Sequence, residues 1–130
     1  MTIAPDIRCP CLSGEVYGAC CGRYHSGAHT APTAEVLMRS RYSAFALGLE
    51  RYLLNSWHPS TRPDSVDLDD ETRWTRLDIE DVRRGGPTDS EGVVRFTAIY
   101  RDADGGHRLT ETSRFVRESG VWFYVDGIHA

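Results

Sequence analysis

The 130-residue sequence contains no lysine, so all 15 basic side chains are arginines. Together with 19 acidic residues they give a formal net charge of -4. A general nucleic-acid binder usually needs a net basic surface to displace counterions from phosphates, so the composition argues against that class. Without lysine, arginine must serve both solubility and any recognition of anions.

The sequence also lacks a long hydrophobic run. The longest uninterrupted apolar stretch, residues 121–125, is far too short to cross a bilayer, and the opening residues MTIAPDIRCP have no apolar segment of an export signal. We therefore expect a cytoplasmic protein that does not associate with membranes. In a reducing cytosol, clustered cysteines are more often metal ligands than disulfides.

Signature motifs of several enzyme and metal-binding classes are absent as well. There is no Gly-rich phosphate loop and no G-x-S-x-G nucleophile turn. The acidic stretch at residues 64–72 lacks the glycine and ligand spacing of an EF-hand, which predicts a solvated loop or short helix. The sequence therefore specifies no reaction.

The residues that are present divide into two parts. Residues 1–31 are rich in Cys, Gly, Ala and Pro, which predicts a loop-built knuckle and a linker, and residues 32–130 are expected to form one folded unit. A helical pattern begins at Ala34 behind the plausible N-cap Thr33 and is interrupted at Gly48. A second helix over residues 49–57 should end before Pro59.

The C-terminal half has the alternation of β-strands. Four such runs, residues 74–84, 93–102, 107–118 and 121–127, are separated by turn-rich segments. This order predicts an antiparallel meander behind two helices, and hence an α+β fold.

All four cysteines lie in one short stretch, CPCLSGEVYGACCG, at residues 9–22. Cys9 and Cys11 form one close pair and Cys20 and Cys21 another, so a turn between the pairs can bring four thiolates around one zinc ion. A site closed by four cysteines leaves no coordination position for a substrate, which predicts a structural zinc. Glycines within and after the loop would permit its tight turns.

Other interpretations of the cysteines stay open at this point. Two disulfides, an iron-sulfur cluster, or a mixed site using His25 or His29 would also employ such residues. A thiol-redox or metal-handling role for Cys20 and Cys21 is a further alternative, which predicts weakly held zinc. We expect Arg8 and Arg23 to help neutralise the thiolate charge.

Several segments resemble known families. CPCLSGEVYGACC is similar to the SEC-C motif, a zinc-binding knuckle found at the end of the secretion ATPase SecA, although Leu12 stands where that motif usually has glycine. MRSRYSAFALG, SWHPSTRP and SRFVRESGVWFYVDG together resemble the YchJ-like family of uncharacterised bacterial proteins. The resemblance implies a nuclear-transport-factor-2-like (NTF2-like, cystatin-like) roll of helices against a bent sheet that often encloses a pocket. It implies no reaction.

An arginine on the predicted core face of the first helix indicates where such a pocket would lie. Arg41 falls within the apolar stripe formed by Met38, Tyr42 and Phe45, and a buried guanidinium needs polar partners. A two-residue turn at positions 119–120 would pair Ser113 with Asp126 and place a set of side chains on one sheet face. With Arg41, Tyr42 and His58 added from the helices, the remaining pocket candidates are Glu111, Ser113, Trp122, Tyr124 and Asp126.

Two functions follow from these features. The first is an accessory or adaptor protein that presents its zinc knuckle to a protein partner. The second is an enzyme or small-ligand binder that uses the pocket. An ion pair between Arg41 and Glu111 or Asp126 that merely docks helix on sheet is the ordinary structural explanation. A cavity lined by the candidates would favour the second function, and a filled core the first. The NTF2-like fold also allows a homodimer through the open face of the sheet.

Overall fold

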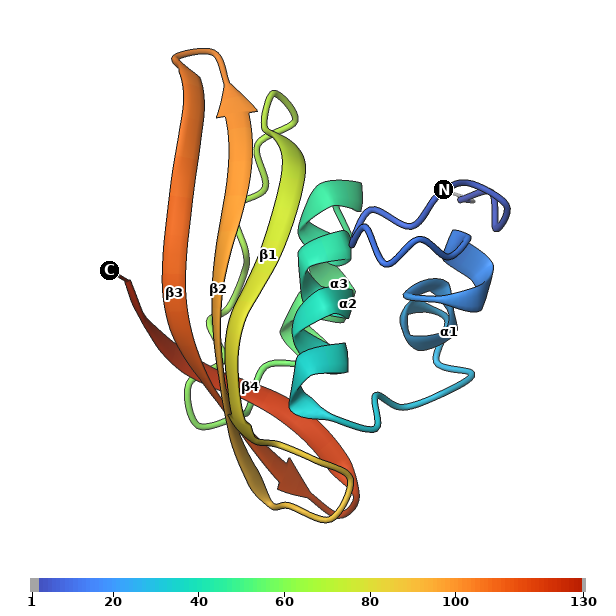
Figure 1. Ribbon diagram of the computed structural model, residues 1–130, viewed down its shortest axis with the longest axis vertical. Helices are drawn as coiled ribbons and strands as arrows, with labels where there is room; N and C mark the ends of the chain where they lie inside the picture. Colours follow the sequence, from blue (N-terminus) through green and yellow to red (C-terminus); the bar gives the residue numbers. More distant parts are fainter. Residues whose placement is uncertain (1–2, 130) are drawn as a thin grey trace.

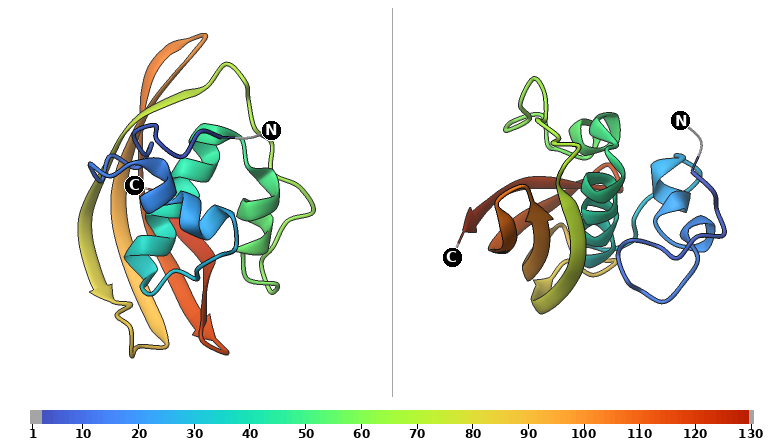
Figure 2. Two further views of the ribbon diagram at one scale, coloured as in Figure 1. Left: turned by 90° about the vertical axis from the view of Figure 1, so that its right-hand side faces the viewer. Right: turned by 90° about the horizontal axis from the view of Figure 1, so that it is seen from above.

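The computed structural model describes residues 3–129, which form three layers (Figure 1). A four-stranded sheet makes the first layer, two helices cover one of its faces, and the N-terminal segment packs against the outer side of those helices (Figure 2). The elements are η1 (Tyr17–Ala19), α1 (Gly22–His25), α2 (Ala34–Leu47), α3 (Glu50–Asn55), β1 (Arg73–Arg84), β2 (Glu91–Asp102), β3 (Gly105–Glu118) and β4 (Val121–His129). The predicted α+β fold is confirmed.

The helices begin and end at the signals that the sequence carries. Thr33 caps α2, because its hydroxyl accepts a hydrogen bond from the Val36 backbone N–H at 3.1 Å. Gly48 ends α2 in the left-handed conformation with φ of 73°. After α3 the chain becomes extended at Trp57 and His58, ahead of Pro59.

The sheet is an antiparallel meander in the order β1-β2-β3-β4. The turn between β3 and β4 consists of Ser119 and Gly120, both with positive φ, which suits the right-handed twist of the paired strands. Arg117 pairs with Trp122 and Phe115 with Tyr124, as predicted.

The predicted pairing of Ser113 with Asp126 is wrong, because β4 contains a β-bulge. The register shifts between Arg114 and Phe115, so that Asp126 pairs with Arg114 and Ser113 pairs with Gly127. An extra residue in one strand turns every later side chain to the opposite face. Asp126 therefore lies on the open face of the sheet, where Arg114 binds its carboxylate through two hydrogen bonds of 2.7 and 2.6 Å.

The core lies between α2, α3 and the covered face of the sheet. Leu53 from α3, Val94 from β2 and Phe115 from β3 are its fully buried large side chains. The first turn of α2 is fixed to the sheet, since the Ala34 backbone N–H donates to the carbonyl of Gly85 after β1 at 2.9 Å. Among residues 3–129, no helix has the length and apolar character needed to cross a membrane.

Candidate metal centre and ligand cavity

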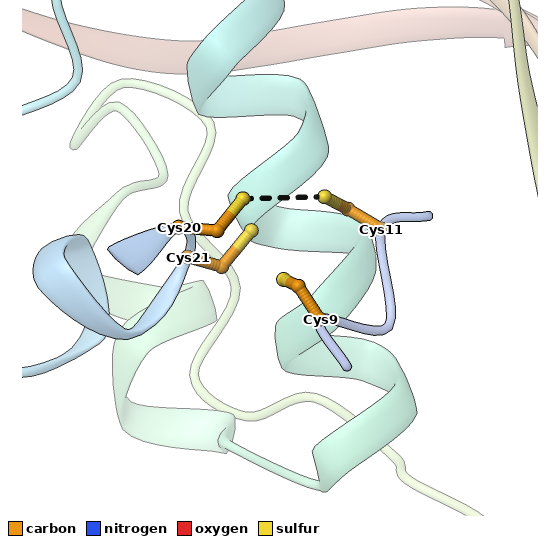
Figure 3. Close-up of side chains that lie close together, drawn as sticks. All are labelled: Cys9, Cys11, Cys20 and Cys21. Carbon is orange, nitrogen blue, oxygen red and sulfur yellow. Dashed lines mark hydrogen bonds between the residues drawn. The ribbon is translucent and has the colours of Figure 1, made fainter. Parts of the chain in front are cut away.

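The four cysteines converge on one point (Figure 3). Their Sγ atoms all lie within 4.8 Å of one another, and the Sγ atoms of Cys11 and Cys20 are 3.6 Å apart. Four thiolates around a zinc ion at about 2.3 Å would be separated by roughly 3.8 Å, so the cluster has the dimensions of a tetrahedral site. All four cysteines are free thiols, which contradicts the disulfide alternative.

Local backbone geometry explains how the two pairs meet. The first pair lies in a tight turn closed by a hydrogen bond from the Leu12 N–H to the Cys9 carbonyl at 3.1 Å, and Leu12 has a φ of 63°. Glycine adopts this left-handed conformation without the strain that a side chain such as that of Leu12 brings. Gly22 follows the second pair, and a Cβ at that position would lie 2.8 Å from the Tyr17 carbonyl oxygen.

Helix α2 supplies the outer contacts of the cluster. The Ser43 hydroxyl, which is fully buried, donates to Cys21 Sγ at 3.3 Å and lies 3.7 Å from Cys9 Sγ. Ser13 lies 3.2 Å from Cys20 Sγ on the exposed side. Arg23, which we expected to face the thiolates, instead donates from Nε to the Cys20 carbonyl at 3.1 Å.

The histidines of the N-terminal segment do not join the cysteine cluster. His25 uses both ring nitrogens elsewhere: Nδ1 lies 2.6 Å from the Tyr17 hydroxyl, and Nε2 donates to the Ser40 carbonyl at 2.8 Å. Burial lowers the pKa of His25, so its ring is neutral near pH 7. His29 is exposed. His25 thus docks the knuckle on α2, and the mixed Cys–His site is not the arrangement found.

The electrostatics of the cluster fit a divalent metal. Hydrogen bonds from Cys11 and Cys21 lower the pKa of the Cys9 thiol, whereas the hydrogen bonds of Cys11 and Cys9, together with burial, raise the pKa of Cys21. Of these two thiols, Cys9 is thus the one that more readily carries negative charge, whereas Cys21 resists losing its proton. A bound dication would displace the remaining protons, and four thiolates around it would carry a formal net charge of about -2.

A cavity of about 290 Å³ lies between α2 and the sheet. Four predicted pocket residues, Arg41, Tyr42, Glu111 and Tyr124, line it. The other lining residues are mostly apolar or aromatic: Met38, Phe45, Trp57, Trp74, Phe96, Ala98, Leu109 and His129. The core at this place is hollow, which is the outcome that favours a ligand-binding function over a filled scaffold.

Arg41 reaches the cavity from α2 and is only 3% exposed. Its Nη1 donates to the Leu53 carbonyl at 2.8 Å and to the Ser56 hydroxyl at 2.6 Å. The guanidinium lies over the rings of Trp57 and Tyr124, at 5.0 and 4.5 Å from their centroids. Burial lowers the pKa of Arg41 to about 10, so it is cationic at neutral pH.

Glu111 enters the cavity from β3, and other side chains hold its carboxylate. Ser113 donates to Oε2, Tyr124 donates to the same oxygen at 3.2 Å, and His129 Nε2 lies 2.7 Å from Oε1. No ion pair joins Arg41 to Glu111 or Asp126 within the part of the chain that the structure describes. The predicted docking ion pair is therefore wrong.

The other four candidates, His58, Ser113, Trp122 and Asp126, lie outside the cavity lining. His58 points away from the cavity: its Nδ1 lies 2.7 Å from the Ser60 hydroxyl and its Nε2 lies 3.0 Å from Glu118. Successive residues of an extended segment point to opposite sides, and here the side chain of Trp57 takes the side that faces the cavity. Trp122 is buried beside the linker, where its Nε1 donates to the Pro32 carbonyl at 3.3 Å. Asp126 is on the open face of the sheet, as described above. Ser113 is fully buried and acts only through Glu111.

Sequence reasoning missed His129 and most of the aromatic lining. The bulge in β4 places His129 opposite Glu111, which strict alternation could not predict. Phe96 and Ala98 share the inward face of β2, and the alternation of that strand was an available signal.

Comparisons with known proteins agree with both parts of this architecture. The family model described as "YchJ, middle NTF2-like domain" matches residues 33–127, and the SEC-C motif model matches residues 8–23. Two solved SEC-C motif containing proteins have the same fold. The one from Rhodopseudomonas palustris has a TM-score of 0.81 at 30% identity, covering 94% of this chain and 98% of that chain. The one from Psychrobacter arcticus has a TM-score of 0.78 at 28% identity, covering 95% and 84%.

The fold and the cysteine cluster thus define an NTF2-like domain with an N-terminal SEC-C knuckle. A UPF0225 protein of Chromobacterium violaceum is 52% identical over 126 residues, covering 94% of this chain and 93% of the relative. One from Streptomyces avermitilis is 56% identical over 119 residues, covering 92% and 82%. The chain belongs to this YchJ-like, UPF0225 family.

Proposed function

We propose that this protein binds a small molecule in the cavity of its NTF2-like roll and carries a structural zinc ion in its SEC-C knuckle. The observation that supports the first part is the hollow core, because the cavity holds a buried guanidinium and a buried carboxylate on an otherwise apolar lining. Concave, largely apolar sites with a few polar groups are the usual form of small-molecule sites.

Zinc is the metal that the donor set favours. Four thiolates are soft ligands that suit zinc, and three of the four cysteines are buried, so the site is closed to substrates. A cluster of free thiols also suits a reducing compartment such as the cytoplasm. Cys9, Cys11, Cys20 and Cys21 would hold the ion, and its role would be to fix the two limbs of the knuckle.

The first experiment on zinc is elemental analysis of protein purified without added metal, with thiols titrated before and after chelation. One zinc per chain and four thiols that react only after chelation are expected. Absence of metal with freely reactive thiols would contradict the zinc site and favour the thiol-redox alternative.

Ligand binding can be followed through the cavity itself, because Trp57 and Trp74 line it. Neutral aromatic fragments should change tryptophan fluorescence saturably at one site. Ala98 is 1% exposed and lines the cavity, so Ala98→Leu should fill it and abolish this binding. Ala103→Leu, in the exposed turn after β2, is the matched control and should bind as the wild type does.

The two variants distinguish a binding site from a packing defect. If no neutral, anionic or cationic fragment binds saturably, the proposal is wrong. Equal binding by Ala98→Leu and wild type would also contradict it, because the fragments would then occupy some other place.

An adaptor role of the knuckle is a second candidate, supported by a separate observation. Of the five large hydrophobic side chains that are exposed within residues 3–129, three belong to the knuckle: Ile7, Leu12 and Val16, at 40%, 48% and 44% exposed. Ile7 and Val16 lie on adjacent limbs, since Arg8 and Val16 form an antiparallel bridge. Clustered exposed apolar side chains favour contact with a protein partner.

This candidate predicts that a partner is lost when the knuckle surface is made polar. The double variant Ile7→Ser, Val16→Ser should keep zinc but lose proteins that co-purify stoichiometrically with the wild type. Val82→Ser, at a similarly exposed position on β1, is the control. Identical partner sets for all three proteins would contradict the adaptor role.

A further inference from the structure

No carboxylate within residues 3–129 forms a hydrogen bond or an ion pair with the buried guanidinium of Arg41, and Glu111 acts on it only through space. Within the same range the recorded contacts of the guanidinium are a carbonyl, a hydroxyl and two aromatic rings, none of which carries a negative charge. A buried cation without a counterion is costly, and cation–π contacts offset only part of that cost. The site is therefore arranged to receive an anion.

Donors that could bind that anion are unused. Both Nη1 hydrogens of Arg41 are taken by Leu53 and Ser56, while Nε and Nη2 have no acceptor among the described residues and are not among the fully buried atoms. The Tyr42 hydroxyl is buried without a hydrogen-bond partner, and so is Trp57 Nε1. Tyr42 is 2% exposed and lines the same cavity. Buried polar groups are normally paired, so the unpaired Tyr42 hydroxyl and Trp57 Nε1 indicate a missing acceptor.

The carboxylate in the lining cannot be that acceptor. Glu111 already accepts from Ser113 and Tyr124 and lies against His129. Its charge also limits what enters, because one cation and one anion facing the same cavity disfavour a ligand with more than one negative charge. A compact monoanion therefore fits better than a phosphate ester.

The remaining lining selects the body of the ligand. Phe45, Trp74, Phe96 and Leu109 present apolar or aromatic surfaces. A cavity of about 290 Å³ lies at the lower limit of the usual range for small-molecule sites, roughly 300 to 1,000 Å³. A single aromatic ring or a short branched chain is the size of body that this space accepts.

From these features we infer that the cavity binds a small monocarboxylic acid with an aromatic or branched apolar body, its carboxylate held by Arg41 and Tyr42. This inference rests on the proposed ligand-binding function and specifies the class of its ligand. Arginine suits the task because its planar fork binds a carboxylate through two parallel hydrogen bonds.

The test compares probes that share a phenyl ring and differ in the chemistry and charge of the polar group. Phenylacetate, phenylacetamide and phenethylamine are titrated by calorimetry at one ionic strength. Phenylacetate should bind at one site per chain and at least 10-fold more tightly than the other two, because a hydrogen bond to a charged group contributes about 1.5–3 kcal/mol, or roughly 10- to 100-fold.

Two variants then test the residues. Tyr42→Phe should weaken phenylacetate about 10-fold while leaving the amide unchanged, and it should raise the melting temperature of the free protein because a buried orphan hydroxyl is removed. Tyr24→Phe, on the knuckle, is the matched control. Arg41→Met should abolish selectivity for the carboxylate. If that variant does not fold, Tyr42→Phe and the three probes still decide the inference.

Binding of the amide or the amine as tightly as phenylacetate would overturn the carboxylate assignment while leaving the ligand-binding function intact. Unchanged phenylacetate affinity in Tyr42→Phe would overturn it as well. No binding of phenylacetate, together with saturable binding of neutral fragments that Ala98→Leu removes, would refute the ligand class alone. No binding of any probe would refute both proposals.

Discussion

The Ser43 hydroxyl on α2 donates a hydrogen bond to Cys21 Sγ at 3.3 Å, so the helix that lines the cavity also completes the surroundings of the cysteine cluster. Groups that hydrogen-bond metal ligands orient them and stabilise their charged form. We predict that Ser43→Ala lowers zinc affinity about 10- to 100-fold, measured by competition with a chromophoric chelator.

Ser13→Ala is a graded control for that prediction. Its hydroxyl lies 3.2 Å from Cys20 Sγ but is exposed, so water can replace it and the loss in affinity should be smaller. An effect of Ser13→Ala equal to or larger than that of Ser43→Ala would contradict the role given to the buried hydroxyl.

The cysteine cluster should hold the knuckle together independently of the roll. We predict that Cys11→Ser or Cys20→Ser loses the metal, and that hydrogen exchange then accelerates in residues 3–31 while β2 and β3 keep their protection. The reason is that the short α1 helix and the loops around it have little core of their own. Stoichiometric metal in both variants would refute the assignment of the ligands.

Local signals in the sequence were sufficient for the elements and for the cysteine site. Thr33 marks the start of α2 and Gly48 its end, and Ser119 with Gly120 forms the turn of the last hairpin. These signals were readable because each depends only on the local backbone around the residue. The cysteines are close in sequence, so a turn was enough to predict their convergence. Ser43 was not predictable, since it meets the cluster only through the docking of α2.

The cavity was predictable only in part. The conflict of Arg41 with its apolar stripe correctly indicated a polar place in the core, and alternation brought Glu111 and Tyr124 to it. Asp126 was misplaced because a single bulge reverses the faces beyond it, and a bulge leaves no clear mark in one sequence. Phe96 could have been found from the alternation of β2, whereas the place of Trp74 depends on how β1 closes the space against α2.

Gly127 makes room for the Glu111 carboxylate. The two residues are diagonal neighbours, two positions apart in the register, and a Cβ on Gly127 would overlap the Glu111 carboxylate carbon and oxygen. We predict that Gly127→Ala destabilises the protein by about 1–3 kcal/mol in urea unfolding, the usual cost of overpacking, and weakens ligand binding. Gly106→Ala on β3, whose nearest atom would be 3.6 Å away, should have little effect on stability.

A double variant identifies the cause of that loss. If the overlap with Glu111 is responsible, Gly127→Ala should be far less damaging in a Glu111→Ala background than in the wild type. If the stability losses of Gly127→Ala and Glu111→Ala simply add in the double variant, the overlap between the two residues is not the cause of the destabilisation.

Tyr42 gives the stability a predictable dependence on alkaline pH. Burial raises the pKa of Tyr42 to about 12, against about 10 in an unfolded chain. Between these values the unfolded state loses the hydroxyl proton and the folded state keeps it, so the free energy of unfolding falls as the pH rises from about 10 to about 12. Between about pH 8 and about pH 11, the Tyr42 hydroxyl alone should lower the free energy of unfolding by about 1 kcal/mol. Urea unfolding at both pH values should therefore show a smaller fall for Tyr42→Phe than for the wild type. Equal falls would mean that the Tyr42 hydroxyl is not held in the dry cavity wall from which its ligand-binding role is inferred.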